Sequence, residues 1–272
     1  TRTIDNWKER LVTILVLPLI SCAARLPVYA LMISAFVPSK KIMGIFNLQG
    51  LVMVFMYFLG TITAILIAAL ISRFIKEKDF TSFIMELPPY RMPLARTVFH
   101  QLFMRGKIFI IDAGKIIMAI SILLWFLASF PTINSNGNPT TIHESYAGKI
   151  GHAIEPIIAP LGFDWKIGVG LITSFAAREV MVSTLATLYN IEGEDEIIGI
   201  KEAMQNDINP LTGLPRYTPL IAISIMVFYV YAAQCMATFA IVKSETNSWK
   251  WPIYMIVYMT SLAYLGSFMV YQ

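Results

Sequence analysis

Two cysteines in apolar stretches are the residues best suited to metal chemistry in this 272-residue chain. Cys22 lies in the motif "SCAARLP", three residues before Arg25. The two side chains share one face if a helical turn continues through the motif. A cation beside a thiol favours the thiolate, which is a soft ligand for transition-metal ions. The motif therefore predicts a thiol ligand next to a buried cation.

The second cysteine has several other polar groups beside it. In "AAQCMATF", Gln234, Cys235, Met236 and Thr238 place an amide, a thiol, a thioether and a hydroxyl within five residues. Together these groups suit a soft or borderline divalent cation. The alternative for either thiol, and for the methionine, is packing, because both residue types commonly fill apolar interiors.

Charged residues and prolines interrupt the same apolar stretches. Glu179 follows Arg178 in "SFAARE", and a carboxylate in such surroundings is a proton site, a cation site or the counter-ion of an arginine. Arg25 is either a contact in a path or a clamp on freed backbone carbonyls. Pro27 lacks an amide hydrogen and disfavours helix at the residue before it. We therefore expect the chain to be kinked or unwound at residues 22–25.

The motif "SCAAR" at residues 21–25 recurs as "SFAAR" at residues 174–178. Paired interruptions of two membrane segments are typical of transporters built from repeats, whose broken helices meet near the membrane midplane. A chance match in an alanine-rich chain is the alternative. The repeat assigns structural or gating roles to Ser21, Arg25, Ser174 and Arg178.

The composition indicates a membrane protein. Hydrophobic residues make up 57% of the chain, charged residues make up 14%, and the mean hydropathy is +0.65, which excludes an ordinary soluble domain. Six apolar runs are long enough to span a hydrocarbon core, two of them interrupted by charges. The runs are 11–39, 42–72, 116–142, 167–191, 217–242 and 251–272. The predicted fold is all-α, a polytopic membrane bundle of about six segments with two broken, re-entrant-like helices.

We treat residues 1–272 as one transmembrane domain with three polar connections. These are a basic interfacial connector at 76–106 that contains Glu86 and faces lipid headgroups, an extracytoplasmic loop at 131–164 and an acidic loop at 191–216. With six alternating crossings, twelve Lys and Arg residues lie on one side and six on the other. The positive-inside rule then predicts a multi-pass protein with both termini in the cytoplasm.

Four stretches of the chain resemble the membrane domain of the bacterial ferrous iron transport protein B (FeoB) family. They are "SCAARLPVYAL", "MELPPYRMP", "DWKIGVGLITSFAAREVMVSTLATLY" and "QCMATFAIVKSETNSWKW", in the family's order. The resemblance implies an importer of Fe²⁺ in the bacterial inner membrane, with Gate-type repeats and an N-terminal cytoplasmic GTPase domain. This chain is expected to be the C-terminal part of such a protein.

The resemblance also implies site residues and partners. Cys22 and Cys235 match the family's intramembrane cysteines, proposed Fe²⁺ ligands, and Glu86 and Glu179 match its acidic positions. The expected partners are Fe²⁺, lipids, the GTPase domain, a small FeoA-type accessory protein and further copies of the chain, but no nucleic acid. Two departures are Gln234, where the family often has proline, and Asp112, where it commonly has arginine.

An enzymatic role for this chain is not expected. Each Gly-Lys pair is followed by isoleucine, so the sequence contains no phosphate-binding GxxxxGK[ST] loop, and GTP with Mg²⁺ belongs to the other part of the protein. No permanently bound cofactor is expected. Three rivals to iron transport stay open: a Gate-type transporter of an organic solute such as a nucleoside, a membrane enzyme with a cysteine nucleophile, and a scaffold.

Overall fold

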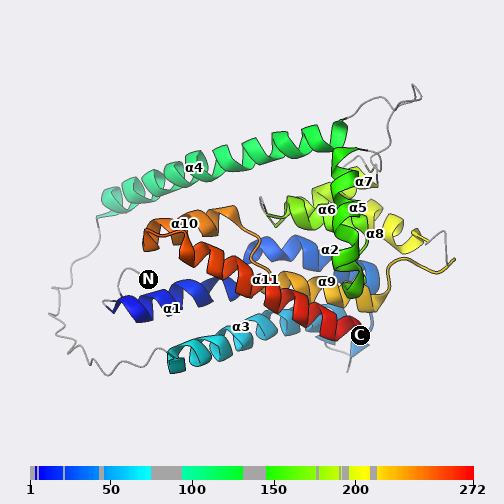
Figure 1. Ribbon diagram of the computed structural model, residues 1–272, viewed down its shortest axis with the longest axis horizontal. Helices are drawn as coiled ribbons and strands as arrows, with labels where there is room; N and C mark the ends of the chain where they lie inside the picture. The colour runs from blue at the N-terminus through cyan, green and yellow to red at the C-terminus, as the bar shows by residue number, and fades with distance from the viewer. Residues whose placement is uncertain are drawn as a thin grey trace.

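A computed structural model of the chain describes residues 4, 6–20, 22–42, 46–74, 94–130, 145–175, 178–189, 191, 196–208 and 213–272. These residues form a helical bundle, which confirms the all-α prediction (Figure 1). The helices in the first half are α1 (Trp7–Val16), α2 (Leu26–Phe36), α3 (Leu48–Phe74) and α4 (Ala95–Ser129). The second half holds α5 (Tyr146–Ile158), α6 (Trp165–Thr173), α7 (Val180–Leu188), α8 (Glu196–Asn206), α9 (Pro219–Tyr231), α10 (Met236–Thr246) and α11 (Lys250–Tyr271).

Three stretches of the described chain are long and apolar enough to cross a membrane: Trp7–Phe36, Leu48–Arg73 and Lys250–Tyr271. The first of these is broken, as predicted. Helix α1 ends at Val16 and is followed by two short 3₁₀ turns, η1 (Leu17–Leu19) and η2 (Ala23–Arg25), before α2 begins. Prolines lie in the first turns of η1 and α2, where the absence of an amide hydrogen costs nothing. A two-stranded pair, β1 (Lys41–Ile42) with β2 (Phe46–Asn47), precedes α3.

Helices α6 and α7 form a re-entrant hairpin instead of one interrupted span. The hydroxyls of Thr173 and Thr184 lie 2.9 Å apart across the hairpin. At its base, Lys166 at the start of α6 and Tyr189 after α7 both donate to Asp207. The chain between residues 166 and 189 therefore enters and leaves at the same end of the bundle.

This hairpin bears on the predicted orientation of the termini. Helix α1 begins at one end of the bundle and α11 finishes at the other (Figure 1). The prediction that both termini lie in the cytoplasm counted residues 167–191 as one crossing of the membrane. The arrangement of the helices does not assign either end to a side of a membrane, so the orientation stays a prediction.

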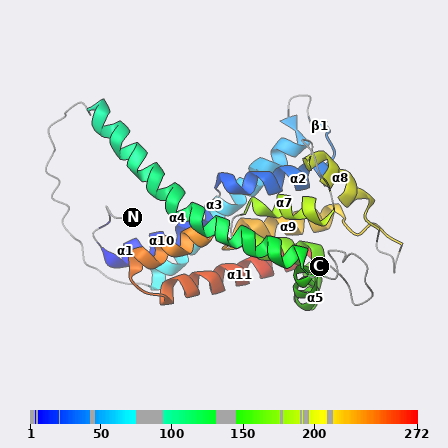
Figure 2. The ribbon, with the colours of Figure 1, turned by 90° about the horizontal axis from the view of Figure 1, so that it is seen from above.

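Helix α9 is the centre of the core. It packs along α11 and also against α2 and α3 (Figure 2). The hydroxyls of Ser224 on α9 and Ser267 on α11 lie 2.5 Å apart, and both residues are fully buried. Small side chains let the two helices approach closely, as is usual for helices packed in a membrane. Helix α9 ends at Tyr231, and α10 begins only at Met236, so a third broken segment follows the first two.

The connections contain more helix than the sequence predicts. Residues 95–106 of the predicted connector belong to α4, which continues for 35 residues because no proline or glycine pair stops it after Pro93. Glu86 lies outside the described residues. The loop 131–164 contains α5, which has Pro156 inside it, and a 3₁₀ turn, η4 (Ala159–Leu161), which has Pro160 at its start. The acidic loop 191–216 contains α8.

Candidate functional site

Three chain breaks meet near the middle of the bundle. At 1.5 Å per residue, the 10 residues of α1 and the 13 residues of α9 place their breaks roughly 15 and 20 Å from opposite ends. Helix α6, with 9 residues, carries the tip of the re-entrant hairpin roughly 14 Å inward. All three breaks therefore lie at similar depth, which is the arrangement expected of a transport site at the midplane.

Backbone groups freed at the third break bond to the hairpin tip. The amide of Met236 donates to the carbonyl of Phe175 at 3.2 Å, and Arg178 Nη2 donates to the carbonyl of Ala232 at 2.8 Å. Below the tip, the buried hydroxyls of Ser174 and Tyr229 lie 2.6 Å apart. The tip thus holds both ends of the 232–235 segment, and it fixes where Cys235 lies.

Arg25 serves as a clamp on its own segment. Its side chain is 0% exposed, and its guanidinium donates to the carbonyls of Pro18 at 3.1 Å and Leu19 at 3.3 Å. Carbonyls freed by the break between α1 and α2 are thereby satisfied inside the bundle, as backbone in a membrane requires. The two arginines of the sequence repeat act differently, because Arg178 bonds to a different segment of the chain.

A small cavity lies where the breaks meet. It measures about 10 Å³, which is room for about one water-sized group. Its lining comprises Pro18, Arg178, Ala233, Gln234, Cys235, Thr238, Phe239 and Met255. Gln234 is 2% exposed, and its Oε1 has no hydrogen-bond partner among the described residues. An unsatisfied buried acceptor costs about 1–3 kcal/mol, so this oxygen is suited to receive a ligand.

Other predicted site residues lie outside this cavity. Cys22 is exposed, and it does not line the cavity with Cys235. Met236 is 41% exposed at the start of α10. Glu179 is exposed and makes no ion pair with a described residue, so the arrangement in which it neutralises Arg178 is not present. Ser21, like Glu86, is outside the described residues.

No group of three or more His, Cys, Asp and Glu side chains within the described ranges is placed to hold a metal ion. The cavity instead offers one thiol, one amide oxygen and one hydroxyl, from Cys235, Gln234 and Thr238. Such a set contacts an ion without enclosing it. This is compatible with a site that an ion leaves again, because conduction requires binding that is weak or shared among several sites.

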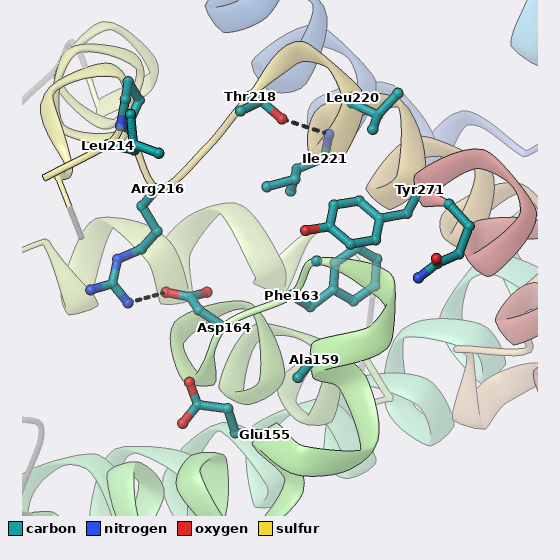
Figure 3. A pocket seen from close by; sticks show the side chains of 13 residues that line it. Glu155, Ala159, Phe163, Asp164, Leu214, Arg216, Thr218, Leu220, Ile221 and Tyr271 are labelled. Carbon is teal, nitrogen blue, oxygen red and sulfur yellow. Dashed lines mark hydrogen bonds and ion pairs between the residues drawn. The ribbon is translucent and has the colours of Figure 1, made fainter. Parts of the chain in front are cut away.

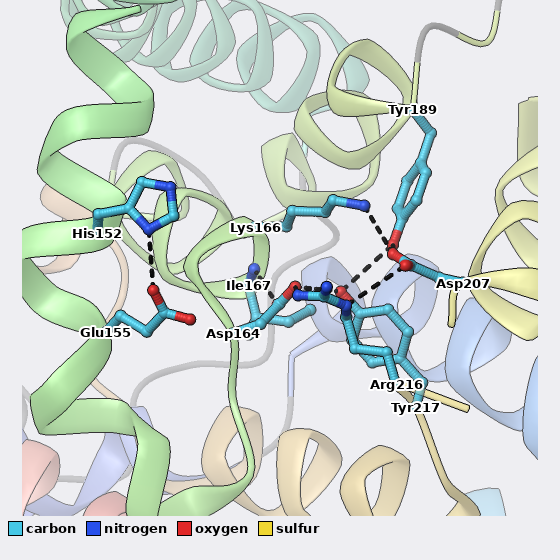
Figure 4. A network of polar contacts seen from close by, with 9 residues as sticks. All are labelled: His152, Glu155, Asp164, Lys166, Ile167, Tyr189, Asp207, Arg216 and Tyr217. Atoms are coloured by element: carbon cyan, nitrogen blue, oxygen red, sulfur yellow. Dashed lines mark hydrogen bonds and ion pairs between the residues drawn. The ribbon is translucent and has the colours of Figure 1, made fainter. Parts of the chain in front are cut away.

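A second polar cluster holds the base of the hairpin (Figure 4). Asp207 accepts hydrogen bonds from Lys166 at 2.6 Å and from Tyr189 at 2.8 Å, and it forms an ion pair with Arg216, whose Nε lies 3.3 Å from Oδ1. The members of this base cluster are Asp164, Lys166, Tyr189, Asp207, Arg216 and Tyr217. Asp164 caps α6 through the amide of Ile167 and joins the cluster through Tyr217 at 2.9 Å and Arg216 at 3.4 Å.

The two carboxylates of the base cluster differ in their environments. Burial raises the pKa of Asp164, which the hydrogen bonds from Ile167 and Tyr217 only partly offset. Burial also acts to raise the pKa of Asp207, but the hydrogen bonds from Lys166 and Tyr189 outweigh it, and the pKa lies below its usual value. Burial raises the pKa of Tyr217 as well, followed by the nearby charge of Asp164.

Beside this cluster, a hollow of about 630 Å³ opens at the end of the bundle where α11 finishes. Glu155, Asp164 and Arg216 line its polar side, and Phe163 and Tyr271 line its apolar side (Figure 3). His152 Nδ1 lies 2.9 Å from Glu155 on α5. Sequence reasoning missed the base cluster, because its members are spread over residues 164–217. The signal present was Asp164 before Trp165, a typical helix N-cap.

Comparison with family models gives two matches. Residues 110–249 match the family described as nucleoside recognition (Gate), which is just over half of the chain. Residues 53–105 match the family described as ferrous iron transport protein B C terminus. No solved structure matches the chain.

Curated relatives are similar over the whole chain. A protein named Fe(2+) transporter FeoB from Leptospira interrogans is 47% identical over 281 residues, and one from Staphylococcus aureus (strain MSSA476) is 35% identical over 272. A fusion protein from Porphyromonas gingivalis, named Fe(2+) transport protein A/Fe(2+) transporter FeoB, is 35% identical over 306. The matches cover 100% of this chain but only 40%, 37% and 35% of the relatives. They confirm the resemblance drawn from the motifs.

Proposed function

This chain belongs to the nucleoside recognition (Gate) family, and we propose that it forms part of the path by which Fe²⁺ crosses a bacterial inner membrane. Its relatives are named Fe(2+) transporters, which supports Fe²⁺ as the proposed cargo. The observation that carries the assignment to a site is the unpartnered Oε1 of Gln234, buried beside Cys235 where three chain breaks meet. A thiol with an amide oxygen suits a borderline divalent cation better than an organic solute.

In this proposal, Cys235 and Gln234 replace part of the water shell of Fe²⁺ as it passes the third break. Met236 and Thr238 supply further weak contacts along the start of α10, and exposed Cys22 and Glu179 supply contacts beyond the cavity. Glu86 is proposed as a contact at the cytoplasmic exit. The positive charge of Arg178 in the lining opposes long residence of a cation, which favours release.

The distribution of basic residues suggests an orientation. The start of α1, the end of α3, the start of α4, the end of α10 and the start of α11 lie at one end of the bundle (Figure 1). The sequence stretches that contain these helix ends, 1–10, 73–107 and 243–250, hold twelve Lys and Arg residues. The connections at the other end contain six. The positive-inside rule then favours a cytoplasmic start of α1 and an extracytoplasmic end of α11. The hollow lined by Glu155 and Asp164 would face the outside, where carboxylates attract cations.

The chain spans about 40% of the length of the Leptospira relative, so the activity of the whole protein involves more than these residues. We propose that a GTPase domain elsewhere in the full protein controls the gate, that GTP and Mg²⁺ bind only there, and that this part holds no permanent cofactor. The fusion relative favours a FeoA-type partner. Membrane lipids and further copies of the chain complete the proposed partners.

Uptake measurements test this function. The full-length protein in liposomes is expected to take up radiolabelled Fe²⁺ under anaerobic conditions, with a rate that depends on GTP. Cys235→Ser and Gln234→Leu are each expected to lower uptake at least about tenfold, which corresponds to about 1.4 kcal/mol. Thr187→Ser, on the exposed face of α7, is the matched control. Unchanged uptake in Cys235→Ser would remove the thiol from the path.

The same preparation distinguishes the organic-solute rival. If the parent protein takes up a labelled nucleoside and no Fe²⁺, the nucleoside description of the family is the better guide, and the iron proposal is wrong.

A further inference from the structure

Arg178 has more buried donors than the described protein satisfies. Its side chain is 5% exposed, and Nη2 donates to the carbonyl of Ala232 at 2.8 Å. Nε and Nη1 are buried and have no hydrogen-bond partner in the described ranges. The residue lines the small cavity between the breaks. Buried donors without partners are rare in native proteins, and they commonly mark an ordered water or ion.

The charge of Arg178 is also not neutralised by a described residue. No carboxylate of the described chain forms an ion pair with it, and neighbouring Glu179 is exposed to the surface. The guanidinium of Arg25 lies close enough to add a second positive charge to the same region. An uncompensated charge inside a membrane bundle is costly, so a paired or solvated state is strongly favoured.

We propose that the cavity is a binding site for one small monovalent anion, with chloride as the abundant example. Arg178 Nε and Nη1 would donate to the anion, and the hydroxyl of Thr238, which also lines the cavity, would supply a third donor. A water molecule would accept from the same donors but would leave the positive charge of Arg178 uncompensated. An anion would accept from the donors and also neutralise this charge. The volume of about 10 Å³ admits a group of one heavy atom and excludes sulfate and organic anions.

This site concerns the protein in the absence of iron, and it does not depend on the proposed transport function. The anion would neutralise the charge of Arg178 and would thereby stabilise the contact between the hairpin tip and the 232–235 segment. Iron uptake in cysteine variants therefore tests the transport proposal, and anion binding in arginine variants tests the anion site, so that either proposal can fail without the other.

Thermal unfolding of the iron-free, full-length protein tests the proposal. The unfolding temperature is measured in chloride, sulfate and gluconate at constant ionic strength and pH. A ligand that binds only the folded state raises this temperature with its concentration, and we expect a rise of at least about 2 °C in 150 mM chloride relative to gluconate. Sulfate is expected to behave like gluconate. Equal unfolding temperatures in all three salts would overturn the proposal and leave a water molecule as the occupant.

Variants locate the effect. Arg178→Gln is expected to abolish the chloride shift, and Thr238→Val, which keeps the guanidinium, is expected to reduce it by at least half. Arg10→Gln is the matched control, because Arg10 pairs with Glu245 away from the cavity, and its chloride shift is expected to stay unchanged. A full chloride shift in Thr238→Val, or in a folded Arg178→Gln variant, would overturn the site.

Discussion

Replacing Asp207 by asparagine tests whether the base cluster holds the re-entrant hairpin. The amide keeps the shape of the side chain and one acceptor oxygen, but it removes the charge that Lys166 and Arg216 face. Lys166 and Asp207 have side chains 17% and 13% exposed, so solvent screens their interaction only partly. We expect Asp207→Asn to destabilise the folded protein strongly.

The magnitude follows from the contacts. A hydrogen bond to a charged group contributes about 1.5–3 kcal/mol, and loss of one partner of a buried pair costs about 3–5 kcal/mol. Asparagine retains part of the bonding to Tyr189, so a cost of about 3 kcal/mol is expected. For a domain of this size, that cost lowers the unfolding temperature by about 6–12 °C.

The assay is thermal unfolding in detergent, followed by tryptophan fluorescence. Glu202→Gln is the matched control, because Glu202 lies exposed on α8 and makes no ion pair with a described residue, and its change is expected to stay within about 0.5 kcal/mol. An unfolding temperature for Asp207→Asn within 1 °C of the parent would mean that the base cluster does not hold the hairpin.

The pH dependence gives a second check on Asp207. Its folded pKa lies below the usual value, so its stabilising effect is present above the unfolded pKa of about 3.9 and is lost as pH falls through the folded pKa. The difference in stability between parent and Asp207→Asn is therefore expected to shrink below about pH 4.

Three further outcomes are expected. Asp164 has a raised pKa, so its carboxyl binds a proton more readily in the folded state than in the unfolded state. The stability of Asp164→Asn relative to the parent should therefore rise as pH increases above about 3.9. Urea titrations at several pH values measure this difference. Tyr229→Phe removes the bond to Ser174 at the hairpin tip and should cost about 1–2 kcal/mol, whereas Tyr254→Phe, on an exposed side chain, should cost under about 0.5 kcal/mol in the same unfolding assay. Gly162 has φ +79°, and a Cβ there would lie 2.4 Å from the Tyr271 ring, so Gly162→Ala should destabilise the protein by over about 2 kcal/mol. Gly213 has φ +67° but open space around it, so Gly213→Ala should cost only about 1 kcal/mol. Equal losses of stability in the two variants would contradict the steric clash with Tyr271.

Local features of the fold were predictable from residue types. Pro27 and the small residues before Arg25 indicated a break at residues 22–25, and the structure has a 3₁₀ turn at Ala23–Arg25 in place of continuous α-helix. Pro27 does not prevent helix at the residue before it, because Leu26 is already the first residue of α2 with αR backbone angles, and the proline lies in the first turn, where it is tolerated. Apolar runs indicated long membrane helices because backbone groups in lipid must bond internally. The importance of the segment around Cys235 followed from its unusual polar side chains.

The path of the chain was not predictable in the same way. A run such as 167–191 is apolar whether it crosses or turns back, and the distinction lies in contacts such as Thr173 with Thr184. The base cluster depends on the distance between Asp164 and residues more than 40 positions later, which no local pattern encodes. The sequence also offered Glu179 as the counter-ion of an arginine, but its side chain is exposed and forms no ion pair with a described residue.

A metal path past Cys235 is best tested by asking whether bound Fe²⁺ protects this thiol from alkylation. The full-length protein carries Cys22→Ser, so that Cys235 is the single reactive thiol of this region. The rate of its reaction with a maleimide is measured anaerobically without metal, with Fe²⁺ and with Mg²⁺. We expect Fe²⁺ to slow the reaction at least about tenfold, because the metal occupies the thiol. Mg²⁺, which prefers oxygen ligands, is expected to leave the rate unchanged. Equal rates with and without Fe²⁺ would contradict a metal path past Cys235.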